Sequence, residues 1–191
     1  MGFLDVLRGG SRKLKQPAPD RLFAMSTAAV TMETGMGLRS DGKAAIVFQR
    51  LETSDFDGIV AEMEEVLHGT GEDTGTEIAK SDDEFGYRWM VLSDPDFEDL
   101  VVGVNGVSSA LVGGGYGDRI LCAVFPFRDD GNRRVFWIYN YKRGAFYPFV
   151  PARGEQQRDS ERELRLKAQI GAELPVEAEL DRWFPLWGIP I

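Results

Sequence analysis

The sequence has 191 residues, of which 43% are hydrophobic and 28% charged, a balance typical of a globular protein and not of a disordered or collagen-like chain. Its net charge is −9, with 31 acidic against 22 basic residues, which argues against a nucleic-acid partner because duplex-binding proteins carry a basic excess. No apolar run approaches the ~20 residues of a membrane-spanning helix, the start lacks a secretory signal, and the single cysteine, Cys122, excludes an internal disulfide, so we expect a cytoplasmic protein.

The first segment, residues 1–19, is predicted to be a short amphipathic helix over residues 2–8 followed by a flexible linker rich in glycine and proline. Its candidate contact residues are four apolar side chains on or beside one helical face and the basic side chains that follow: Phe3, Leu4, Val6, Leu7, Arg8, Arg12, Lys13 and Lys15. We expect this helix to dock on an anionic membrane surface or on a partner protein, with the linker as a tether. A mobile tail or a helix docked on its own domain is the alternative.

Residues 20–191 are predicted to form a single α+β domain. Asp20 is placed to cap a helix whose Leu22 and Phe23 face inward, and the apolar run 43–49 predicts a strand. A helix over 54–68 follows, with its apolar residues at three-to-four spacing: Phe56, Ile59, Val60, Met63 and Leu67. Residues 69–75 read as a loop, and 76–81 and 85–92 as strands paired through an acidic turn, Asp82-Asp83-Glu84.

The second half continues the same pattern of helices and paired strands. Asp94 and Pro95 predict the start of a helix over 95–112, which the glycines at 113–115 end. Strands are predicted over 119–128, 133–141 and 145–150, the first two joined by an Asp-Gly turn. Amphipathic spacing of Leu164, Leu166 and Ile170 predicts a helix over 159–170, and residues 177–183 a short final one. The expected fold is α+β, with one mainly antiparallel sheet packed with helices.

The sequence offers no recognisable catalytic, cofactor or metal site. With one histidine, His68, and one cysteine, a zinc site lacks ligands, and neither residue has the partners of a nucleophile or base. The glycines at 113–117 follow a predicted helix and lack the Lys-Ser or Lys-Thr of a phosphate-binding loop. We therefore predict no cofactor and no enzyme activity, and the alternative is an enzyme with an unrecognised carboxylate-based site.

Two aromatic stretches near the C-terminus have two possible interpretations. The residues concerned are Lys142, Arg143, Phe146, Tyr147, Phe149, Trp183 and Trp187. The simpler interpretation is that the aromatic side chains form core and lid. The sharper one is an exposed aromatic groove, edged by the two basic side chains, that binds a partner helix or peptide.

Three stretches also carry a family resemblance. They are the opening Met-Gly-Phe-Leu-Asp-Val-Leu with its basic, proline-containing linker, the segment Tyr-Lys-Arg-Gly-Ala-Phe-Tyr-Pro-Phe at 141–149, and Arg-Trp-Phe-Pro-Leu-Trp-Gly at 182–188. Together they resemble the PspA-associated protein PspAB family of actinobacteria and haloarchaea. The resemblance implies a place beside PspA, a membrane-associated scaffold of envelope stress, and beside a neighbouring membrane protease. It implies no catalytic residues.

The leading functional hypothesis is a non-enzymatic adaptor or regulatory protein of a PspA-type envelope stress response, the phage shock response. The alternative from a different class is a peripheral membrane-binding protein that acts through residues 1–15 on the inner face of the cell membrane. An enzyme should show a pocket with converging polar groups, and an adaptor an exposed apolar groove.

Overall fold

The computed structural model describes residues 19–153 and 156–191, apart from the side chains of residues 19, 20, 67, 68 and 70–74. The predicted helix over 2–8, the linker over 9–18 and the eight candidate contact residues from Phe3 to Lys15 lie outside the described residues.

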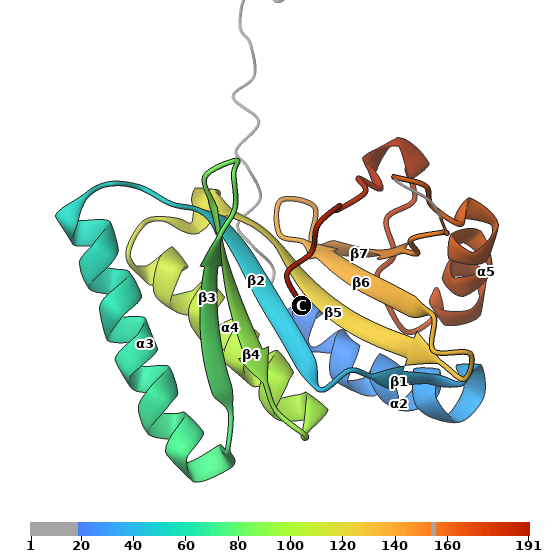
Figure 1. Cartoon of the computed structure of the whole chain (residues 1–191), viewed down its shortest axis with the longest axis horizontal. Coiled ribbons are helices and arrows are strands. Elements are labelled where there is room, and N and C mark those ends of the chain that lie inside the picture. Colours follow the sequence, from blue (N-terminus) through green and yellow to red (C-terminus); the bar gives the residue numbers. More distant parts are fainter. Residues whose placement is uncertain (1–18, 154–155) are drawn as a thin grey trace, which may run out of the picture.

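Seven strands form one antiparallel sheet, as predicted (Figure 1). Their order is β3-β4-β2-β5-β6-β7, and β1 pairs with β5 beside this path. The strands are β1 Leu38–Ser40, β2 Lys43–Gln49, β3 Glu77–Asp82, β4 Tyr87–Ser93, β5 Ile120–Asp129, β6 Arg134–Asn140 and β7 Ala145–Phe149. Ile46 of β2 lies opposite Met90 of β4 on one side and Ala123 of β5 on the other, so this strand occupies the middle of the sheet. The predicted strands over 43–49, 76–92, 119–141 and 145–150 are thus confirmed, and β1 is added to them.

Helices cover one face of the sheet (Figure 1). They are α1 Pro19–Leu22, α2 Ala24–Met36, α3 Ser54–Thr74, α4 Phe97–Gly113 and α5 Ser160–Ile170, with short 3₁₀ turns at η1 Gly117–Arg119 and η2 Leu180–Arg182. The buried face of α4 is the one that the apolar spacing predicts: Leu100, Val101, Val104, Val107, Ser108 and Leu111. Burying this stripe against β2 and β4 gives most of the helix's stability, because an isolated helix of this length is marginal in water.

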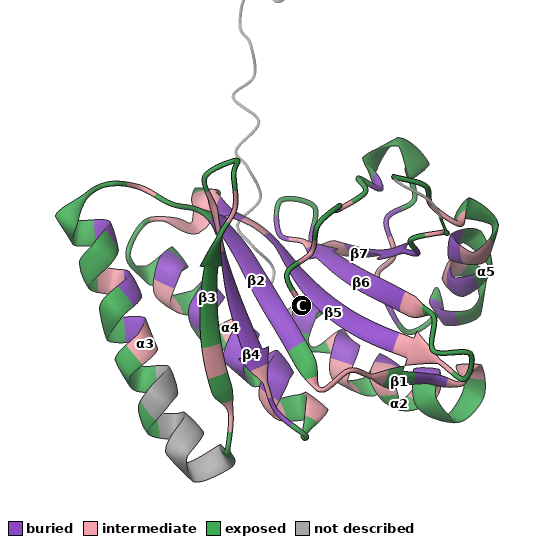
Figure 2. Cartoon of the chain, viewed as in Figure 1, coloured by how far each residue is buried: buried purple, intermediate pink, exposed green. Residues whose placement is uncertain are grey.

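The second face of the sheet is buried as well, although no helix covers it. Alternate residues of the central strands, such as Val47, Val124 and Ile138, form a second apolar cluster there. Figure 2 shows β2, β5 and β6 buried along most of their length. The cover comes from residues 177–191, called the C-terminal segment below. Its Leu186, Ile189 and Ile191 pack on this cluster. Figure 1 shows that segment crossing in front of the sheet.

Several predicted boundaries differ from the structure. The residue that caps α4 is Asp96, whose carboxylate accepts the Glu98 N–H at 2.8 Å. Asp94 is buried instead, and its carboxylate accepts hydrogen bonds from Thr76 Oγ1 and the Asp96 N–H, which fixes the loop before the helix. Helix α3 continues to Thr74 through the predicted loop at 69–75.

Two side chains predicted to face inward are exposed. Phe23, between α1 and α2, is 39% exposed, and Leu164 of α5 is 46% exposed. In each case neighbouring residues fill the inward positions: Leu22 and Met25 at the first site, and Leu166 and Ile170 at the second. The predicted helix over 177–183 is reduced to the single turn η2, because the Glu177 N–H donates to the Phe146 carbonyl of β7.

The turn between β5 and β6 links the sheet to α5 through Asp129. Its carboxylate receives hydrogen bonds from the Arg133 N–H and side chain and an ion pair from Arg162 of α5 at 2.6 Å. Burial alone would raise the pKa of Asp129, but these donors outweigh it and lower the pKa to about 2.

We expect Asp129→Asn to lower the free energy of unfolding by about 1–2 kcal/mol at neutral pH, since the pKa shift sets an upper limit slightly above 2 kcal/mol and solvent at the turn screens part of it. A depressed pKa stabilises the fold above the unfolded value of 3.8, and this contribution is lost as the pH falls from there towards about 2. Urea titrations at several pH values should therefore show the two proteins converging in acid. The control is Asp130→Asn, because that exposed carboxylate lies 3.9 Å from Arg39 and should matter little. An equal loss at every pH would contradict this assignment.

Candidate docking groove

The C-terminal segment is held on the second face of the sheet by Trp183. This side chain is buried and stacks on Tyr147 of β7, with ring centroids 6.4 Å apart. Its indole N–H donates to the Glu177 carbonyl at 3.1 Å, and the Lys167 ammonium lies 5.5 Å from the centre of the ring. One residue further on, the Phe184 carbonyl accepts a hydrogen bond from the Tyr147 hydroxyl.

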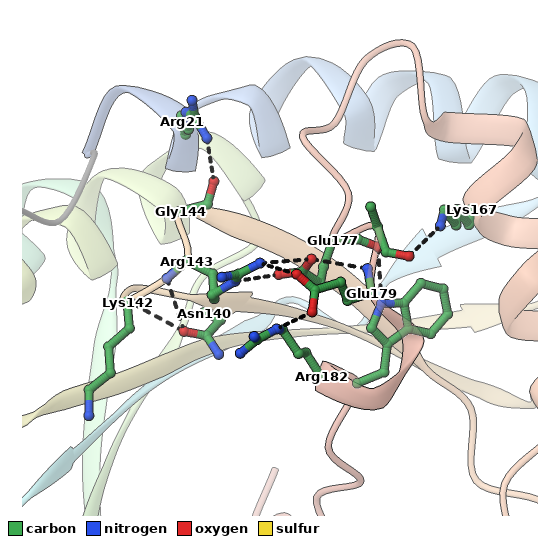
Figure 3. A network of polar contacts seen from close by, with 11 residues as sticks. Arg21, Asn140, Lys142, Arg143, Gly144, Lys167, Glu177, Glu179 and Arg182 are labelled. Atoms are coloured by element: carbon green, nitrogen blue, oxygen red, sulfur yellow. Dashed lines mark hydrogen bonds and ion pairs between the residues drawn. The ribbon is translucent and has the colours of Figure 1, made fainter. Parts of the chain in front are cut away.

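A polar network at the β6–β7 turn holds the beginning of this segment (Figure 3). Arg143 pairs with Glu177 at 2.7 Å and with Glu179 at 3.1 Å, and Arg182 also contacts Glu179 at 2.8 Å. The hydrogen bond from Arg143 lowers the pKa of Glu177, so this carboxylate is charged at neutral pH. The Asn140 side chain accepts the N–H groups of residues 142 and 143 and shapes the turn. The stretch at 140–144 therefore positions the C-terminal segment.

A buried ion pair fixes the same segment from the other side. Glu163 of α5 is only 2% exposed, and its carboxylate accepts Arg158 Nε at 2.9 Å and the Val150 N–H at 2.8 Å. Arg158 also donates to the Trp183 carbonyl at 2.6 Å. Burial raises the pKa of Glu163 in spite of these donors, which shows how strongly the site is desolvated.

A groove opens where the C-terminal segment meets the β3–β4 turn. We call it the docking groove, a cavity of about 750 Å³. Its lining comprises Val47, Ser81, Asp82, Asp83, Glu84, Phe85, Tyr87, Trp89, Leu121, Cys122, Gln156, Pro185, Leu186, Trp187, Gly188 and Pro190. The strands β2, β4 and β5 supply an apolar floor, and residues 185–190 supply one wall. The other wall is the turn, where Phe85 is 75% exposed.

The acidic turn is an ordered wall of this groove. The Asp83 carboxylate accepts the N–H groups of Phe85 and Tyr87 at 2.9 Å and the indole N–H of Trp89 at 3.0 Å. Asp82 forms a two-pronged pair with Arg88, and that hydrogen bond lowers the pKa of Asp82. The acidic turn joins the two strands as predicted, and the structure adds a positioning role for Asp83. It places an exposed phenylalanine beside negative charge.

The floor residue Cys122 is not poised for nucleophilic chemistry. Burial raises the pKa of its thiol to about 12, so it is protonated at neutral pH. It packs as a small apolar side chain, as its place in a strand predicts.

The seven residues proposed from the sequence as a partner groove do not line one surface. Phe146 lies on the helix-covered face, with its ring 4.7 Å from that of Tyr139, while Tyr147, Phe149 and Trp183 are buried on the second face. Adjacent residues of a strand point to opposite faces, which separates Phe146 from Tyr147.

The remaining three residues also have separate places. Lys142 is exposed at the β6–β7 turn, and Arg143 is engaged with Glu177 and Glu179. Only Trp187 lines the docking groove, where it packs edge-on against Phe149 at 5.0 Å. The structure thus corrects the predicted groove: its aromatic residues are mostly core and lid.

The groove that is present involves Phe85, Tyr87 and Trp89, which sequence reasoning did not single out. A large apolar residue inside an acidic turn was a visible signal at Phe85. Within residues 19–153 and 156–191, no three His, Cys, Asp or Glu side chains lie close enough together to hold a metal ion. Among the described helices, none combines the length and apolar character needed to cross a membrane.

Fold and groove together define an α+β protein whose antiparallel sheet carries helices on one face and its own C-terminal segment on the other. The family model of PspAB, PspA associated protein B, matches residues 1–191, so the chain belongs to this family. Searches of curated proteins and of solved structures gave no significant match. The family name indicates association with PspA.

Proposed function

We propose that the protein is a non-enzymatic adaptor or regulator of a PspA-type envelope stress response and that it binds its partner through the docking groove. The single observation that carries this proposal is the groove itself, with an exposed Phe85 facing a wall of the C-terminal segment. The family name supports PspA as the partner. The cytoplasmic side of the membrane as the place of action is part of the proposal. A neighbouring membrane protease, which the resemblance also implies, stays a prediction.

The lining of the groove favours recognition of a peptide or helix. Aromatic and aliphatic side chains such as Tyr87, Leu121 and Trp187 offer pockets for apolar anchors, the contacts that dominate interface energies. The carboxylate of Glu84 borders the groove and complements a partner segment that carries basic residues near its apolar ones. Asp82 and Asp83 are already engaged with Arg88 and with the turn, so they serve to shape the wall.

We expect Phe85→Ser to weaken the binding of purified PspA about tenfold or more, because an exposed aromatic anchor typically contributes more than 1.4 kcal/mol to an interface. The substitution should leave the fold intact, since Phe85 is 75% exposed. The dissociation constant is measured by titration calorimetry for wild type and variant. Val30→Ser is the matched control, because Val30 is 62% exposed but lies on α2, away from the groove.

Two results would contradict the proposal. One is the absence of binding between the wild-type chain and PspA. The other is an equal loss of affinity for Phe85→Ser and Val30→Ser, which would place the contact outside the docking groove.

A further inference from the structure

A second apolar groove lies on the helix-covered face, between α3 and α4, and is separate from the docking groove. Figure 1 shows these two helices on the same side of the sheet, and they pack against each other. The groove, called the helical groove below, has a volume of about 420 Å³. It is lined by Ile59, Glu62, Met63, Val66, Gly106, Ala110 and Gly114. Glu62 is its only ionisable lining residue among the described ones, so an apolar occupant suits it.

We propose that residues 2–8 of this same chain dock in the helical groove as a short helix, with Phe3, Leu4 and Leu7 facing it. The mode is the one by which an amphipathic helix lays its apolar face into a groove. The three side chains share one face at helical spacing, with Val6 beside them.

The dimensions of groove and segment agree. Gly106 and Ala110 of α4 and Gly114, directly after its end, recur every four residues, so they form one small-residue face about 12 Å long. A helix over seven residues is about 10 Å long. Small residues let a neighbouring helix approach closely. At Gly114 the closely packed element is α3, because an added Cβ would lie 2.3 Å from Ile59 Cδ1. Val66, on the α3 side, is 65% exposed.

The topology brings the segment to the correct face. Helix α1, which directly follows residues 1–18, packs against α4, and its Leu22 belongs to the core cluster that also holds Phe56 of α3 and Val104 of α4. The docking groove, by contrast, lies on the opposite face. Residues 9–18 can span about 33 Å when extended, which exceeds the width of a few packed helices at about 10 Å each.

Charge favours the same occupant. Residues 1–16 carry four basic side chains against one acidic side chain, whereas residues 52–99, which include all of α3, carry sixteen acids against two bases. Glu62 lines the helical groove and Glu65 is exposed on the same helix. The basic residues that follow Leu7, beginning with Arg8, would lie next to these carboxylates when the apolar face is docked. Docking would also withhold Phe3, Leu4 and Leu7 from any membrane or partner.

The test uses the full chain with a nitroxide on a cysteine introduced at Glu65 in a Cys122→Ser background. If the segment docks, the nitroxide should cause loss of the ¹⁵N amide signals of residues 3–7. A nitroxide at Leu164 of α5 serves as the control and should leave these signals intact. The paired substitution Leu4→Asp and Leu7→Asp should restore the signals without touching the folded domain. Asp5→Asn, on the opposite helical face, should not.

The proposal is overturned if the signals of residues 3–7 persist with the nitroxide at Glu65. It is also overturned if the signals are lost only when a ¹⁵N-labelled chain is mixed with a separate chain that carries the nitroxide, because the occupant would then be a second copy. Signals that persist in solution and broaden only with anionic vesicles at low salt would assign the segment to lipid. All these results are independent of the Phe85→Ser titration, so failure here leaves the proposed PspA contact standing.

Discussion

Arg158→Ala is expected to destabilise the protein by about 3–5 kcal/mol, because it leaves the buried Glu163 carboxylate without its cation. Glu163 is 2% exposed, and Arg158 is the charged group that contacts both of its oxygens. The same substitution removes the hydrogen bond to the Trp183 carbonyl. We therefore expect the C-terminal segment to loosen before the rest of the fold. Urea unfolding followed by tryptophan fluorescence measures both effects.

The matched control is Arg165→Ala, in the helix α5 that also carries Glu163. Arg165 pairs with Glu161, but the two side chains are 66% and 84% exposed, so removing the pair should cost well under 1 kcal/mol. Because the pKa of Glu163 is raised, its carboxylate can take up a proton at acid pH. In Arg158→Ala this proton removes the cost of a buried carboxylate without a cation. A group with a raised pKa destabilises the fold as the pH rises through its folded value. The gap between wild type and Arg158→Ala should therefore narrow on acidification, and equal costs for both arginine variants would contradict the buried pair.

Trp137→Ala is expected to cost about 3–5 kcal/mol, as for other fully buried aromatic residues. Trp137 lies on β6 with 0% exposure, on the helix-covered face. Its indole N–H is buried and finds no acceptor among the residues that the structure describes. Trp137→Phe should therefore cost less than about 1.5 kcal/mol, because relief of an unsatisfied donor offsets part of the lost packing.

The two substitutions are compared by their midpoints in urea. If Trp137→Phe costs nearly as much as Trp137→Ala, the indole N–H has a partner, and the account of this side chain is wrong. A small effect of Trp137→Ala would mean that the site collapses around the missing ring.

Much of the fold was predictable because local patterns agreed with tertiary packing. The apolar stripe of α4 and the run of β2 are simple examples, since each is periodic and bounded by turn residues. The predicted ends of helices and strands were wrong where contacts between residues distant in sequence determine them. Asp94 reads as a cap, yet its carboxylate is used by Thr76, which is distant in sequence. Phe23 and Leu164 fit an inward spacing, but neighbouring side chains occupy the inward positions.

The candidate site was harder to predict because it depends on which segments meet. The aromatic stretches that carry the family resemblance contain residue types suited to a groove, but most of these residues hold the C-terminal segment in place. Tyr147 and Trp183 stack on each other, and Arg143 pairs with Glu177. The docking groove joins Phe85 to Trp187 across a hundred residues of sequence. The spacing of residues within either stretch does not indicate that the two stretches meet.

The proposed function requires that a partner docks between the β3–β4 turn and the C-terminal segment. The most direct measurement is an NMR titration of the ¹⁵N-labelled full chain with unlabelled, purified PspA. We expect the amide signals to shift or broaden first at Phe85, Trp89, Leu121 and Trp187, and the signal of Leu164 in α5 to change last. Changes that begin on α5 or on the helix-covered face, or a spectrum that PspA leaves unchanged, would contradict it.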